Sequence, residues 1–219
     1  MSTTHEAEVL GEYGPFGEGG VHGVTFDGKL VWVARDNELV AFDPDSEKVV
    51  RRLAVPAEAG TAFDGEHLYQ IANSEILVIE PKDGRVVRKI PAPGKGGDSG
   101  MAWADGYLWV GEYRASKIHQ IDTKTGEIVK TLSSDRFVTG VSCVDGALWH
   151  GALDEPHPAE LRRLAADGTV EETLVLDGIS HVAGVESNGK GAFWCGAEGG
   201  KIRLVKKKES KGGEGKGRR

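Results

Sequence analysis

The sequence predicts an all-β fold, a single five-bladed β-propeller of four-stranded blades whose ring is closed by the N-terminal strand. Three observations predict it. A glycine that opens a short β pattern recurs at intervals of 37 to 44 residues. Each of these glycines is followed by an Asp-Gly or Asn-Gly turn, and each turn is followed by a strand with an aromatic residue. A period of about 40 residues that holds four short strands is typical of one propeller blade.

The repeat divides the chain into blades that start near residues 20, 57, 97, 137 and 181. The opening glycines are Gly23, Gly60, Gly100, Gly140 and Gly184. The turns that follow them are Asp27-Gly28, Asp64-Gly65, Asp105-Gly106, Asp145-Gly146 and Asn188-Gly189. Such dipeptides take positive φ at low cost, so a first and a second strand flank each turn as a β-hairpin. The second strands carry aromatic residues that we expect to pack between neighbouring blades: Trp32, Tyr69, Trp109, Trp149 and Trp194.

The remaining strands complete each blade and close the ring. A third strand ends in a second polar turn, as in residues 118–122, and fourth strands of alternating polarity span residues 49–55, 86–90, 128–132 and 170–176. The fifth blade stops after its third strand, residues 202–205, whereas residues 5–13 form a strand that no blade claims. We therefore expect residues 5–13 to supply the missing outer strand. Residues 1–205 then form the propeller, and residues 206–219 form a disordered basic tail.

Composition limits the partners of this domain. The chain of 219 residues has a formal net charge of −7, which disfavours a nucleic-acid partner. The N-terminus lacks an apolar signal region and no apolar stretch is long enough to span a membrane, so we expect a cytoplasmic protein with no membrane partner. Cys143 and Cys195 lie at different positions of their repeats, so we expect free thiols. The oligomeric state stays open.

One face of the predicted ring is chemically varied. In a propeller the loop that leads into each innermost strand and the loop after each second strand emerge on the same face. Here those loops differ between blades and carry imidazoles, carboxylates and arginines, whereas the opposite loops are explained by turn geometry. Varied loops on a rigid scaffold are where function usually lies. We therefore expect this mouth of the channel to hold a site for a small-molecule substrate or ligand.

Ten residues of this face are candidates for chemistry. The candidate catalytic residues are His22, Glu112, His181 and Asp98. The candidate substrate-binding residues are Arg35, Glu58, Tyr113, Arg114, Thr139 and His150. Converging imidazoles and carboxylates suit proton transfer. His22, His181 and Asp98 also suit a divalent metal such as Mg²⁺, Ca²⁺ or Zn²⁺. The remaining histidines are expected in solvent: His5, His67, His119 and His157.

Two resemblances bear on function. Residues 109–122 resemble a blade of the virginiamycin B lyase, SMP-30 and YVTN-type propellers, and the resemblance extends over residues 20–205. Residues 16–19 and 63–70 resemble parts of the glutaminyl cyclotransferases of plants and bacteria. That second family carries a catalytic glutamate in a Glu-Ser-Thr-Gly run after the second strand of the first blade. This chain has Ala34-Arg35-Asp36-Asn37 at that place, so the resemblance implies a different proton carrier.

The sequence favours an enzyme, with the reaction left between alternatives. The leading hypothesis is a lyase or hydrolase that acts on a small molecule by acid–base or metal-assisted chemistry, the kind of step implied by the lyase resemblance. The first alternative is a glutaminyl-peptide cyclotransferase in which Glu112 or Glu58 moves the proton. The second is a non-catalytic propeller that binds a ligand or protein at the same face. The chain contains no nucleophile elbow, phosphate-binding loop, His-Glu-x-x-His or Cys-x-x-Cys motif, which excludes several other enzyme classes.

Overall fold

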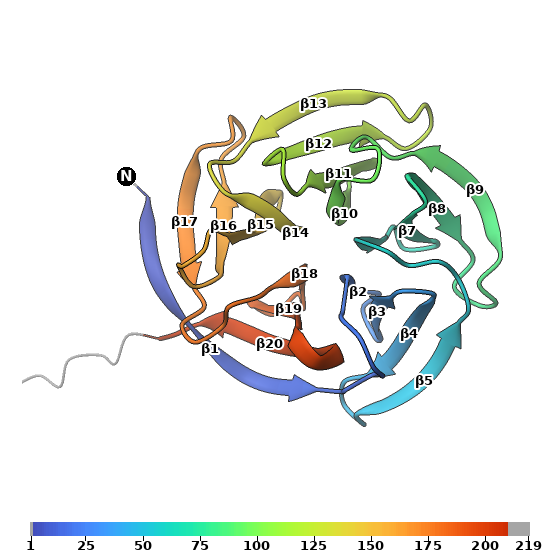
Figure 1. Cartoon of the computed structure of the whole chain (residues 1–219), viewed down its shortest axis with the longest axis horizontal. Helices are drawn as coiled ribbons and strands as arrows, with labels where there is room; N and C mark the ends of the chain where they lie inside the picture. Colours follow the sequence, from blue (N-terminus) through green and yellow to red (C-terminus); the bar gives the residue numbers. More distant parts are fainter. Residues whose placement is uncertain (1, 210–219) are drawn as a thin grey trace, which may run out of the picture.

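The computed structural model describes residues 2–209, and these residues form a ring of five four-stranded blades (Figure 1). Blade 1 consists of β2 (Gly23–Phe26), β3 (Val31–Arg35), β4 (Glu38–Asp43) and β5 (Lys48–Leu53). Blade 2 consists of β6 (Thr61–Phe63), β7 (Leu68–Ala72), β8 (Glu75–Ile79) and β9 (Val86–Pro91). Blade 3 consists of β10 (Asp98–Ala104), β11 (Tyr107–Glu112), β12 (Lys117–Asp122) and β13 (Ile128–Ser133). Blade 4 consists of β14 (Phe137–Val144), β15 (Ala147–Leu153), β16 (Glu160–Leu164) and β17 (Val170–Val175). Blade 5 consists of β18 (Ala183–Ser187), β19 (Ala192–Ala197), β20 (Lys201–Lys207) and β1 (Thr3–Tyr13). The predicted fold class is confirmed.

The N-terminal strand closes the ring as predicted. The second half of β1, from Ala7 to Tyr13, pairs antiparallel with β20 and forms the outer strand of blade 5. Its first half, from Thr3 to Glu6, continues past the blade and pairs parallel with β17 of blade 4. Blades 4 and 5 therefore share one continuous sheet of eight strands. This arrangement covers the seam between the chain ends, where an unpaired strand edge would otherwise lie.

The C-terminal boundary of the propeller differs from the prediction. Lys206 and Lys207 belong to β20, and the backbone N–H of Lys208 donates to the carbonyl of Glu6. The tail therefore begins at least three residues later than predicted, because β1 is long enough to pair with these lysines. The rest of the predicted disordered tail, residues 210–219, lies outside the described residues. Within residues 2–209, no helix is long and apolar enough to cross a membrane.

The five repeated glycines form a ring around the channel. A Cβ atom added to Gly60 would lie 2.5 Å from the backbone nitrogen of Met101, next to Gly100. A Cβ on Gly100 would lie 2.4 Å from the Cα of Gly140, and one on Gly140 would meet the backbone beside Gly184 at 2.5 Å. The innermost strands approach too closely here for any side chain. This close approach is the physical reason for the glycine that marks the sequence repeat.

The repeated turn and the repeated aromatic residue are linked in the first two blades. Asp27 accepts the backbone N–H groups of Lys29 and Leu30 with one carboxylate oxygen and the indole N–H of Trp32 with the other. Asp64 caps its own turn in the same way and accepts the hydroxyl of Tyr69 at 2.9 Å. The aromatic rings then pack between blades. Trp32 lies among buried residues of blades 1 and 2, and the blade 4 ring of Trp149 lies 5.0 Å from Phe193 of blade 5.

Candidate functional site

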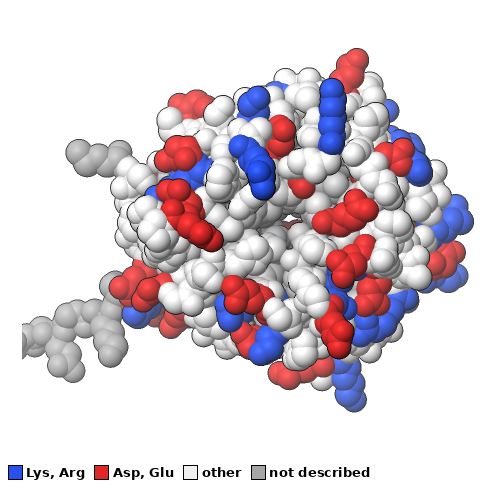
Figure 2. All heavy atoms as spheres, viewed as in Figure 1, with Lys and Arg blue, Asp and Glu red and all other residues white. Residues whose placement is uncertain are grey.

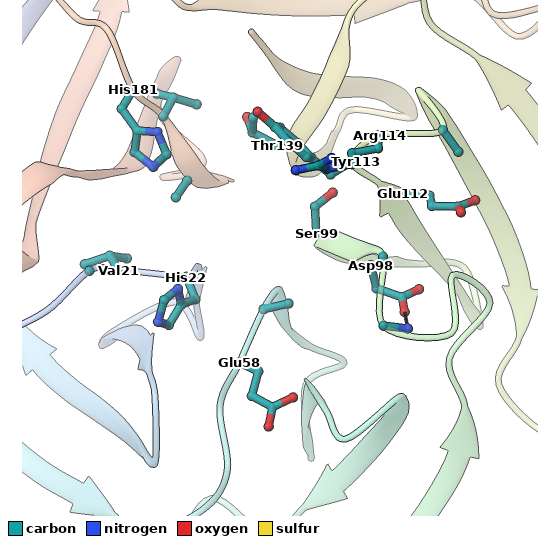
Figure 3. A pocket seen from close by; sticks show the side chains of 17 residues that line it. Val21, His22, Glu58, Asp98, Ser99, Glu112, Tyr113, Arg114, Thr139 and His181 are labelled. Atoms are coloured by element: carbon teal, nitrogen blue, oxygen red, sulfur yellow. Dashed lines mark hydrogen bonds between the residues drawn. The ribbon is translucent and has the colours of Figure 1, made fainter.

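A cavity of about 600 Å³ opens at the predicted mouth of the channel, and every blade contributes to its wall (Figures 2 and 3). Five wall positions share one place in the repeat, directly before a ring glycine. These are His22, Ala59, Ser99, Thr139 and Ala183. Since they lie next to the glycines that surround the channel, these residues form the floor of the cavity. His22 is the ionisable side chain among the five.

His22 is held by a carboxylate from the next hairpin of its own blade. Its Nε2 atom lies 2.8 Å from Oδ1 of Asp36, which follows β3 in a tight turn with φ of 38°. The hydrogen bond and the charge of His22 lower the pKa of the Asp36 carboxyl, so Asp36 stays ionised. An imidazole oriented by a carboxylate through one nitrogen keeps its second nitrogen for proton transfer.

His181 lines the same cavity from blade 5. Figure 3 shows His181 and His22 on the same side of the cavity, with Ser99, Tyr113 and Arg114 across from them. Blades 5 and 1 adjoin through β18 and β2, which explains why two histidines far apart in the sequence come to one wall. This placement agrees with the geometry expected for His22 and His181 from the closed ring.

The three candidate carboxylates take different orientations. Asp98 accepts the backbone N–H groups of Gly94 at 2.7 Å and Gly96 at 3.3 Å, so it shapes the loop before β10. Glu112 points away from the middle of the cavity (Figure 3) and lies 3.2 Å from Nε2 of His119. Glu58 is exposed on the loop before β6 and accepts the backbone N–H of Asn73 at 2.8 Å through one oxygen. Glu58 therefore keeps one carboxylate oxygen for a ligand.

The structure corrects the expectation for His119. It is 7% exposed rather than solvated, because β12 carries it into the blade, where its two nitrogens contact Glu112 and Thr131. The bond from His119 also turns the Glu112 carboxylate outward. Glu112 thus lines the cavity without presenting its carboxylate to the centre.

Two candidate binding residues lie outside the cavity. Arg35 is 5% exposed and donates to the backbone carbonyls of Phe16 and Glu18 and to the carboxylate of Glu38, so it anchors the loop before His22. His150 is completely buried in β15, with Nδ1 3.0 Å from the carbonyl of Gly151. Burial lowers the pKa of His150 to about 4, so it is neutral near pH 7. Neither side chain contributes to the wall, since local packing in blades 1 and 4 engages them elsewhere.

The three proposed metal ligands are not brought together. Within residues 2–209, no group of three His, Cys, Asp or Glu side chains is arranged to hold a metal ion. Asp98 is engaged with its own loop, which separates it from His22 and His181. The remaining candidates, Tyr113, Arg114 and Thr139, do line the cavity.

Sequence reasoning missed the role of Asp36. The residue follows a second strand, as do the other residues of the varied face, and this signal was available. Its pairing with His22, 14 residues away, depends on how two loops of blade 1 meet. Ser99 was also missed, although its place before Gly100 matches that of His22 before Gly23.

The fold resembles solved enzyme structures at low sequence identity. Glutaminyl cyclase of Myxococcus xanthus matches with a TM-score of 0.75 over 94% of this chain and 98% of its own length, at 16% identity. Virginiamycin B lyase of Staphylococcus aureus matches with a TM-score of 0.52 at 18% identity over 86% of this chain, which spans 65% of the lyase. The WD40 propeller domain of Doa1 matches with a TM-score of 0.55 at 14% identity, over 86% of this chain and 64% of that one. At these identities the likeness shows the fold alone.

Sequence comparison matches one family and no curated protein. The family described as "Domain of unknown function (DUF5074)" matches residues 11–209.

Proposed function

We propose that the channel mouth of this chain, which belongs to the family described as Domain of unknown function (DUF5074), is an acid–base active site. The reaction is the cyclisation of an N-terminal glutamine with release of ammonia. The observation that carries the proposal is the contact of Asp36 with His22, which lines the cavity. Asp36 follows the second strand of the first blade, where the cyclotransferase resemblance implied a catalytic carboxylate. The likeness of the whole ring to a glutaminyl cyclase supports the same reaction.

The reaction needs one group that carries a proton. The α-amine nitrogen attacks the carbon of the side-chain amide, and the bond from that carbon to the amide nitrogen breaks. The proton lost by the amine must reach the leaving nitrogen, which departs as ammonia. His22 contacts Asp36 through Nε2, so Nδ1 takes the amine proton and returns it to the leaving nitrogen. The Asp36 carboxylate stabilises the imidazolium that forms in between.

Glu58 fits the binding of the substrate ammonium before the reaction. Of the two glutamates that the sequence suggested, Glu112 is turned toward His119, whereas Glu58 has one carboxylate oxygen outside its bond to Asn73. A carboxylate at the wall attracts an N-terminal ammonium, which loses one proton to solvent to become the amine that attacks.

The test is direct. The purified protein is incubated with an N-terminal glutamine peptide, and ammonia and pyroglutamate are measured. We expect turnover by the wild type and a loss of about 10²- to 10⁴-fold in kcat for His22→Ala, the usual contribution of a general base. His67→Ala is the matched control, because His67 lies beside the Asp64 turn on the opposite face. If the wild type forms no pyroglutamate from any such peptide, the proposal is refuted.

A second function fits the same His22–Asp36 pair. His181 beside it gives two imidazoles in one cavity, which suits a lyase or hydrolase that removes a proton from a small molecule and protonates its leaving group. Turnover of glutamine peptides and of non-peptide substrates distinguishes the two functions. A lyase or hydrolase is favoured if His181→Ala and His22→Ala both abolish turnover of a non-peptide substrate, while glutamine peptides release no ammonia.

A further inference from the structure

Arg114 differs from several other arginines of the propeller in its partners. Arg35, Arg52, Arg136 and Arg162 each have a carboxylate partner. Arg114 is exposed on the loop after β11, lines the cavity, and has no ion pair or side-chain hydrogen bond within residues 2–209. The chain has a net charge of −7, so carboxylates are abundant. An arginine without a carboxylate partner at a cavity wall is suited to bind an anionic ligand.

An aromatic pair lies beside this arginine. Tyr113, which lines the cavity, has its ring 5.0 Å from the ring of Phe137 at an interplanar angle of 39°. Phe137 opens β14 and is 42% exposed, although most large apolar side chains of the ring are buried. Tyr113 comes from blade 3 and Phe137 from blade 4, so the two rings form a ledge where these blades meet. A planar apolar group is attracted to such a surface.

Nearby carboxylates do not oppose an anion at this wall. Asp98 directs its carboxylate to two backbone N–H groups of its own loop, and Glu112 is turned outward to His119. Glu58 comes from a different blade, and Figure 3 shows it across the cavity from Arg114. In Figure 2 acidic side chains lie on several sides of the central opening, and one basic side chain also reaches toward it.

We infer that Arg114, Tyr113 and Phe137 form a subsite for an aromatic carboxylate, a flat apolar group with a carboxylate a few bonds away. Arg114 pairs with the carboxylate, and the ledge of Tyr113 and Phe137 packs against the ring. Under the proposed function, on which this further step rests, the substrate is a glutaminyl dipeptide with an aromatic second residue and a free carboxylate. A dipeptide spans about 7 Å, and cavities of this size hold small molecules.

The experiment separates the subsite from the reaction. Binding of N-acetylphenylalanine and of its amide is measured by calorimetry on the wild type, Arg114→Gln and Arg85→Gln. Arg85→Gln is the control: Arg85 follows the turn after β8 on the opposite face, and its substitution removes the same charge. Ammonia release is measured in parallel from Gln-Phe and from Gln-Phe amide.

The subsite predicts that the wild type binds the acid at least ten-fold more tightly than the amide. It also predicts that Arg114→Gln loses this preference while Arg85→Gln keeps it. Equal binding of acid and amide by the wild type overturns the subsite, even if both peptides release ammonia. The expected binding pattern without ammonia release supports the subsite and removes the proposed function. Tyr113→Leu gives a second test, since it should reduce binding of N-acetylphenylalanine but not of N-acetylalanine.

Discussion

Glu186 is an ionisable group placed below the glycine ring, and its titration can be predicted from its contacts. Its carboxylate accepts hydrogen bonds from Ser142 at 2.9 Å and Thr25 at 3.0 Å, and from the backbone N–H of Ser187. It thereby joins the innermost strands of blades 4, 5 and 1. Although part of the residue surface is exposed, these contacts enclose the carboxylate. Burial raises the pKa of Glu186 to about 7 against an ordinary 4.5, and the three hydrogen bonds oppose this only in part.

The sign of the effect follows from proton binding. Between pH 4.5 and about 7 the folded protein keeps a proton on Glu186 that the unfolded chain has released. Stability therefore falls as the pH rises through this range. The gap between the two pKa values corresponds to an upper limit of about 3 kcal/mol in the free energy of unfolding.

His150 acts in the opposite direction. Its folded pKa of about 4 lies below the ordinary 6.5, so the unfolded chain binds a proton that the folded protein does not. This contribution is present above pH 6.5 and is lost as the pH falls toward 4. The two gaps are of similar size, and their effects offset each other in the wild type. The titration of Glu186 therefore appears only when the free energy of unfolding of the wild type is compared with that of a Glu186 variant.

The perturbation is Glu186→Gln, which keeps the shape and removes the charge. We expect the free energy of unfolding of the variant minus that of wild type to be about 2 kcal/mol higher near pH 8 than near pH 5. The variant is thus relatively more stable at the higher pH. Urea denaturation at both pH values measures it, with Glu66→Gln as control because the Glu66 side chain is 84% exposed. If the difference between variant and wild type is the same at both pH values within about 0.5 kcal/mol, the reasoning is refuted.

Three further predictions follow from the same structure. Gly100→Ala should lower the free energy of unfolding by about 3 kcal/mol or more, because its Cβ would lie 2.4 Å from the Cα of Gly140. Thermal denaturation checks this against Gly20→Ala, whose Cβ meets nothing closer than 3.7 Å, and equal stabilities would contradict the glycine ring. Arg35→Met should leave the ring folded but release the loop before β2. Faster cleavage of this loop in limited proteolysis and weaker ligand binding would show the release. Unchanged cleavage would argue against an anchoring role. Removal of residues 2–13 should abolish cooperative unfolding, since β20 and β17 lose their shared partner, and a sharp melting transition in the truncated protein would show that closure is not needed.

The sequence by itself determined the architecture of this protein. The repeat of glycine, turn and aromatic residue encodes features that act over a few residues: a backbone contact too close for a side chain, a positive φ, and an aspartate that caps its own turn. The orphan strand at residues 5–13 predicted the closure because one blade lacked an outer strand. The same alignment placed His22 and His181 at one mouth, since the ring brings blades 1 and 5 together.

Only the tertiary structure decided which side chains face the cavity. Asp36 reaches His22, His119 turns Glu112 outward, and two loop N–H groups engage Asp98. Each of these depends on contacts between segments whose relative position the repeat does not specify. A propeller scaffold is set by local patterns that recur in every blade, whereas its mouth is built from loops that differ between blades. The direction of a side chain there follows from its hydrogen-bond partners, and those partners are known only once the loops have been folded against one another.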